Sequence, residues 1–104
     1  MQLEWNIPLT KHPQHILEEA GYHAFVDPNT QKTSYIMRVS TGFYPRYHVY
    51  IQMRNNRTCI VDLHIDQKKA SYEGYTAHAG EYEGALVEEE LMRLQRWFQY
   101  YAYA

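Results

Sequence analysis

Two consecutive runs of alternating side chains constrain the fold of this chain more than any other feature. In residues 46–53, apolar side chains stand at every second position and mostly polar ones lie between them, and residues 58–66 repeat the pattern. A period of two is typical of β-strands that bury one face and expose the other. The two runs therefore predict an antiparallel hairpin with one apolar face and one polar face.

The parity of the apolar positions constrains the loop between these two strands. A two-residue turn at Asn55 and Asn56 would place Val49 opposite Asp62 and would mix apolar and charged side chains on one face. We therefore predict an odd or bulged turn, with Asn55 or Asn56 in the left-handed region that asparagine tolerates. This turn puts the apolar set on one face: Tyr47, Val49, Ile51, Met53, Cys59, Val61, Leu63 and Ile65.

The N-terminal half of the chain predicts further short elements. Residues 3–9 read as a short extended segment, which Pro8 confines to a sheet edge. Thr10 or His12 can cap a short helix that has Pro13 in its first turn and ends at Gly21. Residues 22–26 and 33–39 predict a hairpin around the turn-forming residues 27–30.

The C-terminal part predicts a long loop followed by a helix. Residues 67–83 have no sustained period, although 72–77 could form a short strand. From Gly84 onward the apolar positions follow a helical spacing, and the tyrosine-rich end, residues 100–104, is expected to fray unless its rings meet a partner. The helical stripe consists of Val87, Leu91, Leu94, Phe98 and Tyr101, with Trp97, Tyr100 and Tyr103 beside it as a contact patch.

These elements predict a two-layer α+β sandwich formed by residues 1–104 as a single domain. The expected order is α-β-β-β-β-α, with a mainly antiparallel four-stranded sheet. A short N-terminal helix and a longer C-terminal helix cover one face of this sheet.

Charge and composition limit the partners that this fold could have. The net charge is −2, with six basic and four acidic residues in 1–60 and four basic and eight acidic residues in 61–104. Residues 29–60 contain no Asp or Glu, and their Lys and Arg side chains are interleaved with aromatic ones, a pattern that single-stranded nucleic-acid binding uses. The same pattern also has a purely structural explanation. Tyrosine is common in β-strands, and arginine is common on a sheet face that contacts solvent. Because the whole chain is acidic, a protein partner or self-association is slightly favoured over nucleic acid.

The cysteine content and hydropathy predict a cytoplasmic protein that does not enter a membrane. Cys59 is the only cysteine, so no disulfide can form within the chain. The first residues lack a basic start followed by an apolar run, and no stretch approaches the roughly 20 apolar residues of a membrane-spanning helix.

The polar face of the second hairpin is the main candidate site. Residues two apart on a strand lie roughly 6.6 Å apart and neighbouring strands about 4.8 Å apart, so the polar side chains of both strands share one patch. A five-residue loop sets His48 across from His64 and Arg46 across from Asp66, whereas a three-residue loop sets His48 across from Asp62. The patch contains Arg46, His48, Tyr50, Asp62, His64 and Asp66.

This patch has a catalytic, a metal-binding and a purely structural interpretation. In the catalytic interpretation, His64 is the general base and Asp62 or Asp66 orients it. In the metal-binding interpretation, His48, His64 and one Asp hold a divalent metal, and His78 or Glu81 completes the ligand set. In the structural interpretation, the patch is a solvated sheet face with cross-strand charge pairs.

The leading functional hypothesis is a small non-enzymatic module that binds another macromolecule. Its contacts would come from the aromatic and basic sheet face together with the tyrosine-rich loop. A hydrolytic enzyme centred on His64 and a single-stranded nucleic-acid-binding domain are the alternatives. The partner-binding candidates are Arg46, His48, Tyr50, Tyr72, Tyr75 and Tyr82.

Overall fold

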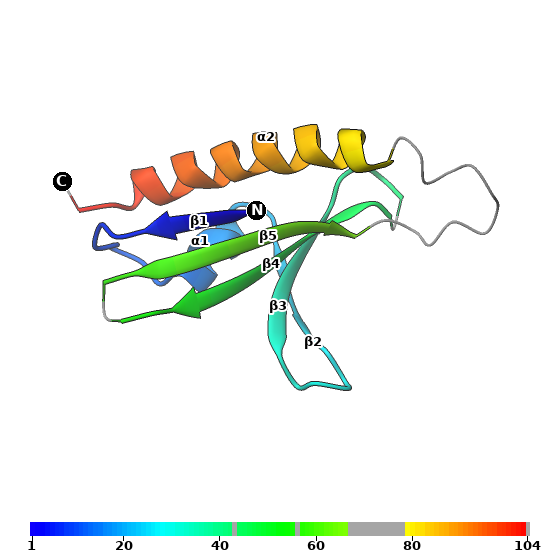
Figure 1. Cartoon of the computed structure of the whole chain (residues 1–104). Coiled ribbons are helices and arrows are strands. Elements are labelled where there is room, and N and C mark those ends of the chain that lie inside the picture. Colours follow the sequence, from blue (N-terminus) through cyan, green and yellow to red (C-terminus); the bar gives the residue numbers. More distant parts are fainter. Residues whose placement is uncertain (43, 56, 67–78, 104) are drawn as a thin grey trace.

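The computed structural model describes residues 1–42, 44–55, 57–66 and 79–103, with the backbone alone at 79–83. Its five strands form one antiparallel sheet in the order β1-β5-β4-β3-β2 (Figure 1). With its two helices it is a small α+β domain, which confirms the predicted class. The elements are β1 (Gln2–Trp5), α1 (Pro13–Glu19), β2 (His23–Val26), β3 (Thr33–Arg38), β4 (Arg46–Met53), β5 (Cys59–Asp66) and α2 (Ala79–Tyr100).

The sheet has five strands rather than the four predicted. The additional strand is β1, which lies within the segment expected to be extended and pairs with β5, so that Leu3 faces Val61. This pairing places Trp5 in the core, where it is almost fully buried. The alternation in residues 3–9 is too short to distinguish a paired edge strand from an isolated extended segment.

The predicted odd loop between β4 and β5 is confirmed, and of the two registers that it allows the structure has the one with a five-residue loop. Five residues separate the paired residues Met53 and Cys59, so the loop is odd, and Val49 faces Leu63. The Oδ1 atom of Asn55 closes the loop by accepting hydrogen bonds from two backbone N–H groups, each at 2.8 Å. The left-handed conformation predicted for Asn55 or Asn56 is not found at Asn55, and Asn56 lies outside the described residues.

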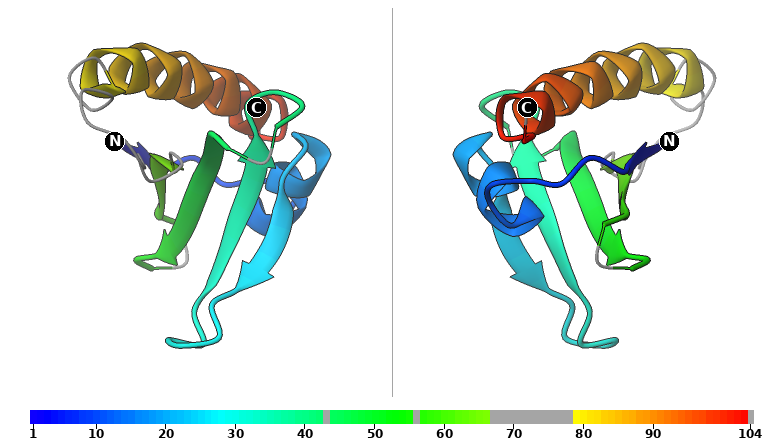
Figure 2. Two further views of the ribbon diagram at one scale, coloured as in Figure 1. Left: turned by 90° about the vertical axis from the view of Figure 1, so that its right-hand side faces the viewer. Right: turned by 90° about the vertical axis from the view of Figure 1, so that its left-hand side faces the viewer.

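The first hairpin is also confirmed, with a longer connection than a tight turn. Ala24 of β2 faces Tyr35 of β3. The Oδ1 atom of Asp27 accepts the N–H of Asn29 at 2.8 Å, and Gln31 takes the left-handed conformation with φ 62°. The hairpin projects away from the rest of the molecule, and all four residues of β2 are exposed (Figures 1 and 2).

Both predicted helices are present. His12 caps α1 by accepting the N–H of Gln14 on its Nδ1 atom, and Gly21 follows the helix with φ 110°. α2 begins at Ala79 and is therefore longer than the apolar period predicts. Its first residues carry no apolar stripe, so the periodicity locates only the part of the helix that packs on the sheet.

The hydrophobic core lies between the two helices and the face of the sheet that carries the odd-numbered side chains of β4 and β5. In Figure 2 both helices lie on the same side of the sheet. Among the described residues, no helix is long and apolar enough to cross a membrane. The core includes Ile16 and Leu17 of α1, Leu94 and Phe98 of α2, and Val49, Val61 and Leu63 of the sheet.

The C-terminal segment after α2 is held in place, contrary to the expected fraying. The backbone N–H of Thr10 donates to the carbonyl of Tyr101 at 2.7 Å, and the N–H of Tyr103 donates to the carbonyl of Pro8 at 2.9 Å. We call residues 101–103 the C-terminal strap. It ties the end of α2 to the connection between β1 and α1.

Candidate functional site: the open face of the sheet

The candidate site is the sheet face that no described helix covers, which we call the open face. The even-numbered side chains of β3, β4 and β5 point to it. The observed register places His48 opposite His64, Arg46 opposite Asp66 and Tyr50 opposite Asp62. The structure therefore brings together the six residues that the sequence assigned to one patch.

Asp66 organises one end of the open face. Its Oδ2 atom lies 3.0 Å from Nδ1 of His48 and 3.4 Å from Nε of Arg46. The other ring nitrogen of His48, Nε2, lies 2.7 Å from the hydroxyl oxygen of Ser34 on β3. When Nδ1 carries the proton that is donated to Asp66, Nε2 accepts the hydroxyl proton of Ser34.

A row of rings crosses the open face, and we call it the ring row. The guanidinium carbon of Arg46 lies 5.8 Å from the ring centroid of Phe25 on β2 and 5.2 Å from that of Tyr44. Further along, the ring of Tyr50 lies 4.8 Å from that of His48 and 6.4 Å from that of His64. The ring row therefore consists of Phe25, Tyr44, His48, Tyr50 and His64, with the Arg46 guanidinium between the first two.

The order Asp66, His48, Ser34 is the order of acid, base and nucleophile in hydrolytic triads. Ser34, however, is only 2% exposed, so a substrate carbonyl cannot reach its hydroxyl oxygen. Ser34 also lies inside β3, which pairs with a strand on each side, so the ladder uses the nearby backbone N–H groups. Asp66, His48 and Ser34 thus link β5, β4 and β3, and among the residues that the structure describes this arrangement offers no nucleophile that a substrate could reach.

The pair predicted to be catalytic, His64 and Asp62, lies at the solvent-facing end of the row. Nε2 of His64 is 3.2 Å from Oδ1 of Asp62, and the His64 side chain is 51% exposed. This geometry suits a general base oriented by a carboxylate. Asp66, the third predicted catalytic residue, is engaged by Arg46 and His48 instead, and a catalytic role for His64 stays a prediction.

The predicted metal ligands are only partly described. No three His, Cys, Asp or Glu side chains lie close enough to hold a metal ion within the part of the chain that the structure describes. His78 lies outside that part, as do Tyr72 and Tyr75 of the predicted contact loop. Glu81 and Tyr82 fall in the first turns of α2, where the structure describes only the backbone.

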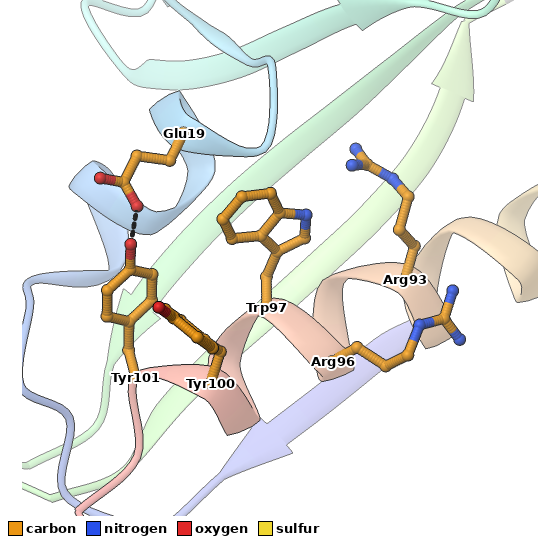
Figure 3. Close-up of a pocket in the computed structure, with 6 residues that line it drawn as sticks. All are labelled: Glu19, Arg93, Arg96, Trp97, Tyr100 and Tyr101. Atoms are coloured by element: carbon orange, nitrogen blue, oxygen red, sulfur yellow. Dashed lines mark hydrogen bonds between the residues drawn. The ribbon is translucent and has the colours of Figure 1, made fainter.

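Apart from the open face, a shallow groove with a volume of about 610 Å³ lies between α1 and the C-terminal half of α2 (Figure 3). Tyr100 is 77% exposed beside it, and Trp97 is half-buried, so two of the three aromatic residues predicted as a contact patch line this groove. Its remaining lining residues are Glu19, Arg93, Arg96 and Tyr101.

The charges at the α1 side of this groove are paired within the molecule. The Glu19 carboxylate accepts hydrogen bonds from Lys11 and from the Tyr101 hydroxyl, and these bonds hold the pKa of Glu19 below its usual value. The Lys11 ammonium also lies 5.0 Å from the centroid of the Tyr101 ring. The Lys11–Glu19 salt bridge and the Tyr101 ring therefore border the groove at this side.

A buried polar cluster between α2 and Tyr22 was not predicted from the sequence. Oε2 of Glu90 accepts the Tyr22 hydroxyl at 2.6 Å, and both Glu90 oxygens accept N–H groups of Arg93, at 2.6 and 2.8 Å. Burial, followed by the hydrogen bond to Glu90, raises the pKa of Tyr22 well above its usual value. Glu90 lies in a run of acids that resembles a solvated helix face, and its helical phase is the only signal that points it inward.

The described residues form a small α+β domain with one sheet face that neither of its helices covers. Comparisons with known protein families, with curated proteins and with solved structures find no match for this chain.

Proposed function

We propose that this chain is a non-enzymatic binding module that contacts a partner protein through the open face. The observation that carries this proposal is the ring row, which places aromatic side chains and one guanidinium along a single sheet surface. Aromatic residues and arginine are enriched in protein interfaces relative to other surfaces. They also supply most of the binding energy in such interfaces.

The close polar contacts of the open face support this proposal because they hold its side chains in place before a partner binds. Arg46 and His48 are both largely buried and both held by Asp66. A surface whose side chains are already ordered loses little conformational entropy when a partner binds. Tyr50 is partly exposed and His64 is exposed, so both can contact a partner.

The local charges favour a protein partner over nucleic acid. Asp62 and Asp66 lie on the same face as Arg46 and offset its positive charge. A nucleic-acid site needs a surplus of cations to neutralise phosphates. A protein partner of mixed charge fits a nearly neutral surface.

Site-specific photocrosslinking tests the proposed surface. A benzophenone side chain is introduced in place of Tyr50, and the matched control carries it in place of Met92, which is exposed on α2. We expect position 50 to crosslink to a defined protein and position 92 not to do so. The partner is then purified, and Tyr50→Ala should weaken its binding at least tenfold, about 1.4 kcal/mol, while Met92→Ala leaves it unchanged.

Two results would overturn the protein-binding proposal. One is a purified partner that binds Tyr50→Ala as tightly as the unaltered chain. The other is retention on single-stranded RNA or DNA that falls steeply with salt and is lost in Tyr50→Ala, which would make nucleic acid the ligand of the open face.

A further inference from the structure

β2 is an edge strand whose outer side is open. It is the last strand of the sheet, and among the described residues no strand pairs with it on the side away from β3. The hairpin that carries it projects away from the rest of the molecule, and all four of its residues are exposed (Figures 1 and 2). An edge strand presents unpaired backbone N–H and C=O groups that another strand can use.

The pairing with β3 determines which residues of β2 direct their backbone groups outward. The N–H of Asp27 donates to the carbonyl of Lys32 at 3.0 Å, just beyond the strand. Hydrogen-bonded and non-hydrogen-bonded pairs alternate along an antiparallel ladder, so Phe25 also directs its backbone groups to β3. Ala24 and Val26 therefore direct theirs away from the sheet.

β2 lacks the features that keep edge strands from pairing. Proteins protect such edges with charged side chains, proline or β-bulges. β2 contains no Lys, Arg, Asp, Glu or Pro, and the described register with β3 is continuous. It exposes Phe25 and Val26, at 37% and 54%. The opposite edge, β1, carries the acidic residue Glu4 instead, so β2 is the edge that another strand can extend.

We propose that β2 pairs with β2 of a second copy of this chain, in an antiparallel, two-fold symmetric ladder centred on Phe25. Only residues whose backbone groups point outward can form hydrogen bonds across this junction. In this register Ala24 of each copy faces Val26 of the other. Each of these two pairs exchanges two hydrogen bonds, which gives four in total.

The residues that flank β2 make this register the one with the most hydrogen bonds. The N–H of Tyr22 already donates to the carbonyl of Leu17 at 2.9 Å, and Pro28 has no N–H. A ladder centred on Ala24 would set Val26 against Tyr22, and one centred on Val26 would set Ala24 against Pro28. Each of these ladders would form fewer hydrogen bonds than the proposed one.

The two-fold axis brings the Phe25 rings of both copies together on the open face. Facing residues of a non-hydrogen-bonded antiparallel pair have Cα atoms about 4.5 Å apart, which places their side chains in contact. The net charge of −2 opposes association of two copies only weakly. The pairing joins two open faces into one surface, and it does not require the partner proposed for that face.

Sedimentation equilibrium measures this association. Because the interface is small, we expect weak association, with the average mass rising from that of one copy towards that of two up to roughly 1 mM chain. Val26→Pro removes an outward N–H and should raise the dissociation constant at least about tenfold. Gln2→Pro is the matched control and should not change it. Met1 is hydrogen-bonded to Leu63 of β5, so the N–H of Gln2 points outward from the other edge.

Cysteine crosslinking tests the register, in a Cys59→Ala background. Phe25→Cys places the two thiols at a facing position, where the Cα separation suits a disulfide. Val26→Cys is the control, because its two copies lie diagonally across the ladder, roughly 8 Å apart, beyond disulfide range. We expect Phe25→Cys to form a covalent dimer at least about tenfold faster than Val26→Cys.

Three results would overturn the proposal. One is an unaltered chain that keeps the mass of a single copy over the whole concentration range. Another is a folded Val26→Pro chain that associates as strongly as the unaltered one; if this variant does not fold, Val26→Lys, which puts a charge on the edge, takes its place. The third is crosslinking of Val26→Cys as fast as that of Phe25→Cys.

Discussion

At the scale of single residues, Glu90 is the most consequential polar side chain of the core. Glu90→Ala leaves the Tyr22 hydroxyl and the Arg93 guanidinium without their shared acceptor. Breaking a buried ion pair from one side costs about 3–5 kcal/mol, and because the Arg93 side chain is 32% exposed we expect about 3 kcal/mol. Urea denaturation measures this loss.

The neighbouring Glu89 provides the control for this prediction, because its side chain is exposed on the same helix. Glu89→Ala should change the free energy of unfolding by no more than about 0.5 kcal/mol. Equal effects at both positions would contradict the buried role of Glu90. Tyr22→Phe removes only one hydroxyl and should cost about 1 kcal/mol.

The Cys59 thiol makes stability depend on alkaline pH. Burial raises its pKa from an ordinary value near 9.0 to about 11. A group whose pKa is raised by folding contributes stability that is fully present below its unfolded pKa and is lost as the pH rises through its folded pKa. The free energy of unfolding should therefore fall between about pH 9 and pH 11, and it should fall less in Cys59→Ala.

The difference between the two pH profiles isolates the contribution of this cysteine from those of the other ionisable groups. Identical slopes in the unaltered chain and in Cys59→Ala would refute the prediction. The same burial should make Cys59 react slowly with iodoacetamide at pH 8 until the protein is unfolded.

At the scale of secondary-structure elements, the β4–β5 hairpin depends on Asn55. Its side-chain oxygen accepts two backbone N–H groups within the loop, both at 2.8 Å. Asn55→Ala removes both bonds and should cost about 1–2 kcal/mol. Arg54→Ala, which breaks only the exposed pair with Glu4, should cost less than about 1 kcal/mol, so equal losses in denaturation would argue against the role of Asn55.

Local alternation of side chains is visible in the sequence, whereas contacts between distant segments are not. Parity predicts that the β4–β5 loop is odd, because one slipped residue would carry Leu63 to the polar face, but it does not choose between a three-residue and a five-residue loop. The same argument could not place Ser34 beside His48, since the alignment of β3 with β4 depends on the aperiodic connection 39–45. The pair of Tyr22 and Glu90 was equally hidden, because a contact across 68 positions leaves no local pattern.

At the scale of the whole molecule, the C-terminal strap joins the end of α2 to the connection between β1 and α1. Ending the chain at Tyr100 removes the carbonyl of Tyr101, which accepts both the N–H and the hydroxyl of Thr10. We expect a loss of at least about 1 kcal/mol and a Tm lower by about 5 °C or more. Hydrogen exchange should also accelerate at the amides of residues 9–11.

Tyr103→Ala is the matched control for the strap, since the exposed ring is removed while the backbone bond to Pro8 remains. Its Tm should stay within about 2 °C of the unaltered chain. A truncated chain that melts together with this control would show that the strap does not stabilise the domain.

The shared carboxylate of Asp66 makes the open face a thermodynamically coupled unit. Arg46 and His48 both contact the same Asp66 oxygen, so removing either one changes the surroundings of the other. Double-mutant cycles between these two positions should accordingly be non-additive, with interaction energies of at least about 0.5 kcal/mol. Single substitutions will therefore not give the separate free-energy contribution of Arg46 or of His48 to the open face.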